Sequence, residues 1–167
     1  MKVGLRTWKT VLSVFICFML DELRNNGIPF YSAIASILCI QKNTKDSFKE
    51  GKKREIATII GAIAGVIYLY IERLLPSIQF DFIRYILLSL LLIPIIQVSR
   101  LLKQEGGTFL MCVVFLSVTV NHNLDISPLT FAINRVIDTS IGILVGISIN
   151  SIPFHKIKEI SLKHPSI

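Results

Sequence analysis

The sequence is poor in charged residues. Asp, Glu, Lys and Arg make up only 17% of the chain, against about a quarter of a typical soluble domain. Hydrophobic residues reach 52%, and the mean hydropathy is +0.64. The few charges gather in short clusters between apolar runs, as expected for a chain that lies mostly in lipid, because the bilayer core cannot solvate charge. The composition therefore predicts an integral membrane protein.

Motifs for disulfides, metals and catalysis are also lacking. The three cysteines lie inside apolar runs and their number is odd, which argues against a disulfide framework. The three histidines are scattered without zinc-ligand spacing. The sequence contains no glycine-rich phosphate loop followed by Lys-Ser or Lys-Thr, and no Ser/His/Asp or Cys/His grouping. We therefore expect no enzymatic activity, no metal site and no cofactor.

Six apolar segments follow one another along the chain. They cover residues 7–23, 28–41, 56–75, 82–99, 108–121 and 130–152. Backbone polar groups in lipid must be satisfied within the segment, which predicts helices, and the segments lack the alternation of barrel strands. The predicted fold is all-α and polytopic, with about six transmembrane helices. It forms one membrane domain over residues 1–155, followed by a short basic cytoplasmic tail over 156–167.

The basic residues predict the orientation. If the N-terminus is cytoplasmic and all six segments cross, most of the 18 Lys and Arg residues lie on the cytoplasmic side, many in a polar loop expected at residues 42–55. Both termini are then cytoplasmic. Orientation also accounts for the net charge of +7, so membrane lipids, and not nucleic acid, are the expected partner. The loop could also bind anionic headgroups or concentrate organic anions.

One pattern occurs twice, and a single constant offset relates its two copies. Arginine is followed by threonine at +4 and glycines at +7 and +11; the residues are Arg54, Thr58, Gly61, Gly65 and Arg135, Thr139, Gly142, Gly146. At about 100° per residue these positions share one helix face. We expect the four glycines to permit close helix packing. The alternative is that two unrelated small-residue interfaces share the pattern by chance.

The repeated pattern divides the chain into halves of about 1–81 and 82–155, each with three segments. Because three is odd, equivalent segments cross in opposite directions, which is the inverted-topology repeat common in secondary transporters. The second and fifth segments, 28–41 and 108–121, are both short for a full crossing. Paired short segments are a pointer to a substrate pathway.

Asp138 lies well inside an apolar segment, three residues after Arg135. Two interpretations are open. The two side chains could form an intrahelical ion pair that offsets the cost of burial. Alternatively, Arg135 could attract an anion, with Asp138 setting its position or relaying a proton. The candidate substrate-binding residues are Arg54, Thr58, Arg135, Asp138 and Thr139.

Three stretches of the chain resemble the aromatic acid exporter family, which is related to fusaric acid resistance (FUSC-type) membrane proteins. The first begins at Pro29-Phe-Tyr31-Ser-Ala33 and continues through Gln41, Ser47, Gly51, Arg54, Thr58, Gly61 and Gly65. The others cover residues 4–10 and 135–142. Many family members continue into a cytoplasmic C-terminal domain, whereas this sequence stops shortly after the sixth segment, as expected of a short form.

The resemblance implies a bacterial plasma-membrane protein that exports aromatic or other small organic acids. Distant relatives assemble as dimers, so a homo-oligomer, with a dimer favoured, is expected. The leading hypothesis is a transport protein with a small organic anion as substrate. The alternative is a non-transporting membrane scaffold or an accessory subunit of a larger membrane assembly.

Overall fold

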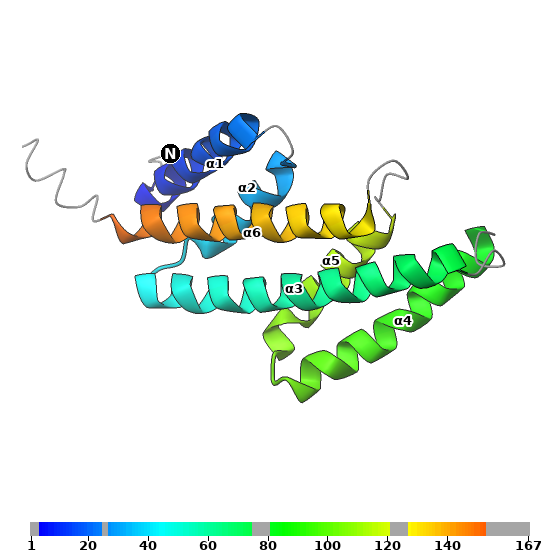
Figure 1. The fold of residues 1–167 in the computed structure, drawn as a ribbon. Helices are drawn as coiled ribbons and strands as arrows, with labels where there is room; N and C mark the ends of the chain where they lie inside the picture. Colours follow the sequence, from blue (N-terminus) through cyan, green and yellow to red (C-terminus); the bar gives the residue numbers. More distant parts are fainter. Residues whose placement is uncertain (1–3, 25–26, 75–80, 121–126, 153–167) are drawn as a thin grey trace, which may run out of the picture.

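The computed structural model describes residues 4–24, 27–74, 81–120 and 127–152. Within these ranges the chain is helical and contains no strand, which confirms the all-α prediction. The elements are α1 (Leu5–Arg24), α2 (Pro29–Cys39), α3 (Thr44–Leu74), α4 (Asp81–Leu101), the short 3-10 helix η2 (Glu105–Gly107), α5 (Thr108–Val120) and α6 (Pro128–Ser151) (Figure 1). The expected tail at 156–167 lies outside the described residues.

Three of the described helices are long and apolar enough to cross a membrane: α3, α4 from Phe82, and α6. The short pair is α2, with 11 residues, and α5, with 13. At 1.5 Å per residue they extend about 17 and 20 Å, against a hydrocarbon core of about 30 Å. Helix α1 has 20 residues and adds a sixth, amphipathic helix. The predicted six helices are therefore present in the described residues; five of them are apolar, and two of these five are too short to span alone.

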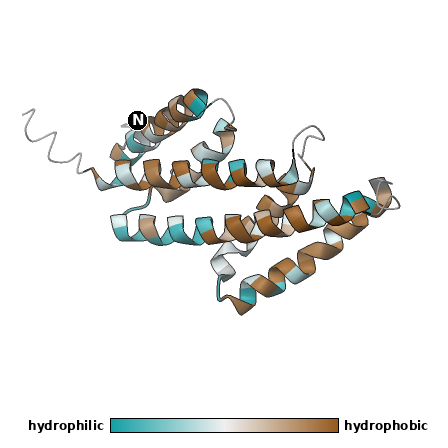
Figure 2. Ribbon diagram, viewed as in Figure 1, coloured by the Kyte–Doolittle hydropathy of each residue, from teal (hydrophilic) through white to brown (hydrophobic). Residues whose placement is uncertain are grey.

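The polar stretch at residues 42–55, predicted as a loop, is helical from Thr44 onward. Helix α3 has 31 residues, about 46 Å of helix, so its first turns extend well beyond the length that the core requires. Figure 2 shows these first turns as mostly hydrophilic and the middle of α3 as hydrophobic. The loop prediction was wrong because a polar stretch is kept out of the lipid core but can still be helical. This stretch is rich in Lys, Glu and Arg, which favour helices, and has no proline.

Helices α3 and α6 lie side by side and antiparallel at the centre of the fold (Figure 1). The glycines of the repeated pattern bring a short helix against each of them. A Cβ atom at Gly61 of α3 would lie 2.6 Å from the carbonyl oxygen of Met111 in α5. A Cβ atom at Gly146 of α6 would lie 2.8 Å from the carbonyl oxygen of Ser36 in α2. The backbones approach this closely only because the side chain is absent.

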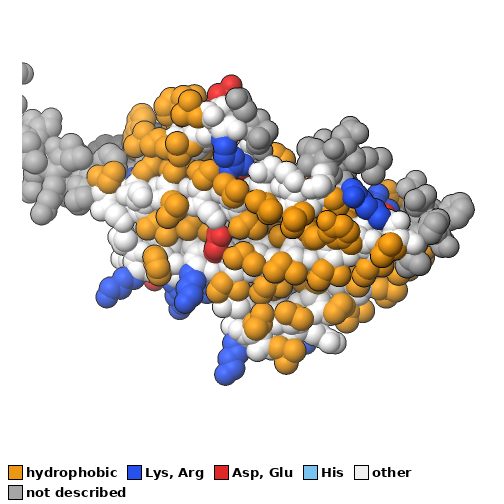
Figure 3. All heavy atoms as spheres, in the orientation of Figure 1, with side chains coloured by type: hydrophobic (Ala, Val, Ile, Leu, Met, Phe, Trp, Pro, Cys, Tyr) orange, Lys and Arg blue, Asp and Glu red, His pale blue; other side chains and the backbone are white. Residues whose placement is uncertain are grey.

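Each short helix buries one face against its neighbours and leaves the other exposed, for example at Phe30 of α2 and Phe109 of α5. Helix α1 packs on α2 and α6, and α4 packs on α5. In α5, Met111, Val114, Phe115 and Val118 are almost completely buried and form part of the core. The face drawn in Figure 3 carries a broad band of hydrophobic side chains over α3, α4 and α6. A surface of this kind is suited to contact with lipid.

Candidate functional site

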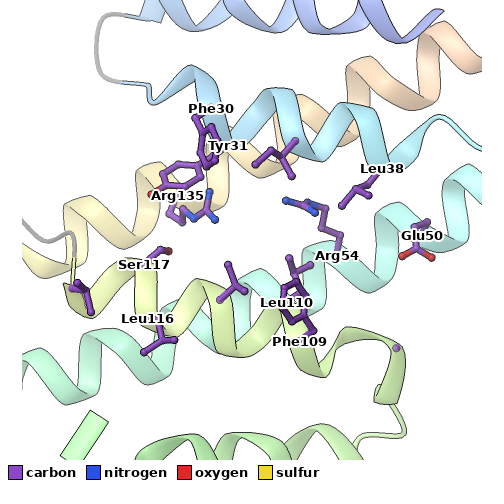
Figure 4. Close-up of a pocket in the computed structure, with 14 residues that line it drawn as sticks. Phe30, Tyr31, Leu38, Glu50, Arg54, Phe109, Leu110, Leu116, Ser117 and Arg135 are labelled. Atoms are coloured by element: carbon purple, nitrogen blue, oxygen red, sulfur yellow. The ribbon is translucent and has the colours of Figure 1, made fainter. Parts of the chain in front are cut away.

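A cavity of about 710 Å³ lies among α2, α3, α5 and α6 (Figure 4). Most of its wall is hydrophobic and comes from the two short helices. These wall residues are Phe30, Ile34 and Leu38 of α2 and Phe109, Leu110, Val113, Leu116 and Val120 of α5. The short helices therefore form the apolar sides of the cavity, while α3 and α6 each contribute an arginine.

Arg54 of α3 and Arg135 of α6 both point into this cavity (Figure 4). Each residue is only 4% exposed. In both side chains the Nε and Nη1 atoms are buried and have no hydrogen-bond partner within the described part of the chain. Neither guanidinium forms an ion pair with a described carboxylate. A buried charge without a partner costs several kcal/mol, so such groups in membranes normally face a water-filled or ligand-binding cavity.

Tyr31 fixes the position of Arg135. The Cζ atom of Arg135 lies 3.1 Å from the centre of the Tyr31 ring, which is a cation–π contact. Phe30 packs edge-on against the same ring, with 5.6 Å between the ring centres. Sequence reasoning did not assign Tyr31 to the site. Tyr31 belongs to the stretch Pro29-Phe-Tyr31, which carries part of the family resemblance. Nothing in this stretch indicates that Tyr31 contacts α6.

Asp138 does not pair with Arg135. Its carboxylate accepts a hydrogen bond from the guanidinium of Arg24 in α1, and the backbone N–H of Ile28 donates to its other oxygen at 3.1 Å. Asp138 is 1% exposed and does not line the cavity. The proposed intrahelical ion pair is therefore wrong, because Arg135 turns toward Tyr31 and the cavity while Asp138 faces α1 and the start of α2.

Thr58 and Thr139 are also buried away from the cavity. The Thr139 hydroxyl donates to the carbonyl oxygen of Arg135 one turn earlier, at 3.0 Å. Both threonines are 1% exposed, and neither lines the cavity. Of the five residues predicted to bind substrate, the structure brings Arg54 and Arg135 together at one cavity and leaves Thr58, Asp138 and Thr139 outside it.

A family described as aromatic acid exporter family member 1 matches residues 1–152 of the chain. The match covers the six helices and both arginines of the cavity. The chain belongs to the aromatic acid exporter family. Membership of this exporter family suggests transport and supports a membrane location, but it does not specify a substrate.

Several staphylococcal proteins are similar to part of this exporter-family chain. A UPF0421 protein of Staphylococcus epidermidis is 36% identical over 69 residues. UPF0421 proteins of Staphylococcus haemolyticus and Staphylococcus saprophyticus are 36% identical over 73 residues and 38% identical over 69 residues. Each match covers 41% of this chain and 21% of the relative, so the matched region spans about a fifth of those proteins. No solved structure matches the chain.

Proposed function

We propose that this chain is a membrane transport protein, or the membrane part of one, that exports aromatic or other small organic acids through the cavity of Arg54 and Arg135. The observation that carries this proposal is the pair of buried guanidinium groups without anionic partners in an otherwise apolar cavity. Family membership supports transport as the activity.

The chemistry of the cavity suits an acid with an apolar body. A guanidinium binds a carboxylate through two parallel charge-assisted hydrogen bonds, which are stronger than neutral ones. The wall residues Phe30 and Phe109 can pack against a ring or an alkyl chain. The volume of about 710 Å³ lies within the range of about 300–1,000 Å³ that is usual for small-molecule sites.

The arrangement of the helices also supports a transport pathway. The cavity lies between two helices too short to cross the hydrocarbon core, and paired short helices mark substrate sites in inverted-repeat transporters. The inverted repeat, the bacterial plasma membrane, the cytoplasmic position of both termini and a homo-oligomer, with a dimer favoured, belong to this proposal. A second copy of the chain would help to enclose the path from lipid.

Flux in proteoliposomes tests the proposal. The purified chain is reconstituted, and benzoate release is measured above the background of protein-free liposomes. Arg54→Gln and Arg135→Gln should each lower the initial rate about tenfold or more, because each removes a charge-assisted contact. Arg100→Gln is the matched control, since Arg100 is exposed at the end of α4 and does not line the cavity.

Two results would contradict the proposal. One is a well-folded oligomer that carries no organic acid across the bilayer, which would favour the scaffold or accessory-subunit alternative. The other is an unchanged flux in both arginine variants at equal protein content. The second result would retain transport but remove the cavity from the pathway.

A further inference from the structure

The packing of the short helices follows a regular correspondence between the two halves of the chain. Gly61 meets the carbonyl of Met111 in α5, and its counterpart Gly142 meets the carbonyl of Ser32 in α2. One turn later, Gly65 lies against the carbonyl of Phe115 and Gly146 against the carbonyl of Ser36. Ser32 and Met111 are separated along the sequence by the same distance as Ser36 and Phe115. Helix α2 therefore meets α6 as α5 meets α3, in support of the inverted repeat.

Most of the cavity wall follows the same correspondence. Arg54 and Arg135 are separated along the sequence by the same number of residues as the other equivalent members of the repeated pattern. Lining residues of α2 are separated from lining residues of α5 by the same number of residues that separates Ser32 from Met111. The matched pairs are Phe30 and Phe109, Tyr31 and Leu110, Ile34 and Val113, and Leu38 and Ser117. The cavity is thus built from equivalent parts of both halves, and its two guanidiniums occupy equivalent positions.

We propose that Arg54 and Arg135 form one paired site that binds a single organic anion through two separate acidic groups, one at each guanidinium. This inference rests on the cavity being the substrate site of the proposed transporter. It goes beyond that function because it assigns the substrate a second negative charge and predicts selection against acids that carry only one.

The charges around the cavity support a doubly charged occupant. Among the described lining residues, the ionisable side chains besides the two arginines are Glu50 and Tyr31. The Glu50 side chain is 41% exposed and lies 3.6 Å from the Lys53 ammonium group, so it sits near solvent with its own cationic neighbour. Helices α2 and α5 contribute no carboxylate or ammonium group to the described wall.

A ligand with one carboxylate would therefore leave one of the two guanidiniums buried without an ion-pair partner among the described residues. Asp138 does not supply this charge, because its carboxylate is held by Arg24 on the side facing α1. A second carboxylate on the same ligand would gain a charge-assisted pair without losing further translational freedom. The preference for the doubly charged ligand should be on the order of tenfold to a hundredfold in Kd.

Isothermal titration of the full chain in lipid nanodiscs can measure this preference. The probes are isophthalate and its monomethyl ester, which share the ring and its substitution pattern but differ by one negative charge at about pH 7. The wild-type chain should bind one isophthalate and prefer it over the ester by the factor above. In Arg54→Gln or Arg135→Gln the preference should fall close to one, whereas Arg100→Gln should keep it.

Lysine variants protect the test against misfolding. If a glutamine variant does not elute as the wild-type oligomer, Arg54→Lys or Arg135→Lys replaces it; these variants keep the charge and should retain a preference for isophthalate. Equal affinity of the wild-type chain for both probes would overturn the paired site, as would two molecules of ester bound per chain with the affinity of isophthalate. Benzoate flux combined with such a result would leave the transport proposal standing. Selective isophthalate binding without flux would support the paired site and contradict the transport proposal.

Discussion

Replacing Gly61 by alanine should destabilise the protein, although alanine normally stabilises a helix. In an open helix position the exchange of glycine for alanine gains about 1 kcal/mol. At Gly61 the new Cβ would lie 2.6 Å from the Met111 carbonyl oxygen and 2.9 Å from the Val114 Cβ. Both atoms belong to α5 and cannot rotate away, so α5 must move off α3. Overpacking of this kind costs about 1–3 kcal/mol.

The net effect of Gly61→Ala is thus a loss of up to about 2 kcal/mol in the free energy of unfolding. Gly106→Ala is a suitable control, because the nearest atom to its added Cβ is the flexible Lys53 Nζ at 3.5 Å. Thermal unfolding of both variants in the same detergent measures the difference. A melting temperature of Gly61→Ala above that of the wild type, as expected of an open helix position, would refute the close packing of α3 and α5.

Three further outcomes are expected. Tyr31→Leu should weaken organic-acid binding in titration about threefold to thirtyfold, because the cation–π contact that positions Arg135 is lost, whereas Tyr31→Phe should bind nearly as the wild type does. Asp138→Ala should lower the free energy of unfolding by about 2 kcal/mol in denaturant melts. This loss is smaller than that for breaking a fully buried ion pair, because the Arg24 side chain is 24% exposed. Gly146→Ala should resemble Gly61→Ala in thermal unfolding, since its Cβ would lie 2.8 Å from the Ser36 carbonyl oxygen; a raised melting temperature would mean that α2 and α6 are not in close contact.

Hydropathy and residue spacing predicted the helices, and two of the five residues predicted to bind substrate line the cavity. Apolar runs show where lipid or protein must surround the chain. The repeated pattern contains Arg54 and Arg135, but it also contains Thr58 and Thr139, which lie outside the cavity. The helical start of α3 was missed, because a basic stretch outside lipid can be either loop or helix. Hydropathy alone does not distinguish these states.

The partners of the site could not be predicted, because they depend on contacts between distant segments. The contact of Tyr31 with Arg135 joins α2 to α6, and the pair of Arg24 with Asp138 joins α1 to α6. Neither leaves a periodic trace in the sequence. The sequence paired the two short segments but not their individual residues, since most of the matched lining residues of α2 and α5, such as Tyr31 and Leu110, differ in type. The matched residues of α2 and α5 occupy equivalent positions in the packing although they differ in type.

The most direct test of the central claim is equilibrium binding of radiolabelled benzoate to the purified chain, with the Arg54→Gln/Arg135→Gln double variant beside it. The claim is that the two buried guanidiniums of the cavity bind the organic acid. The wild-type chain should bind benzoate saturably, and an excess of unlabelled benzoate should displace it. The double variant, folded and at equal concentration, should bind none above the protein-free background. Undiminished binding by the double variant would contradict the claim.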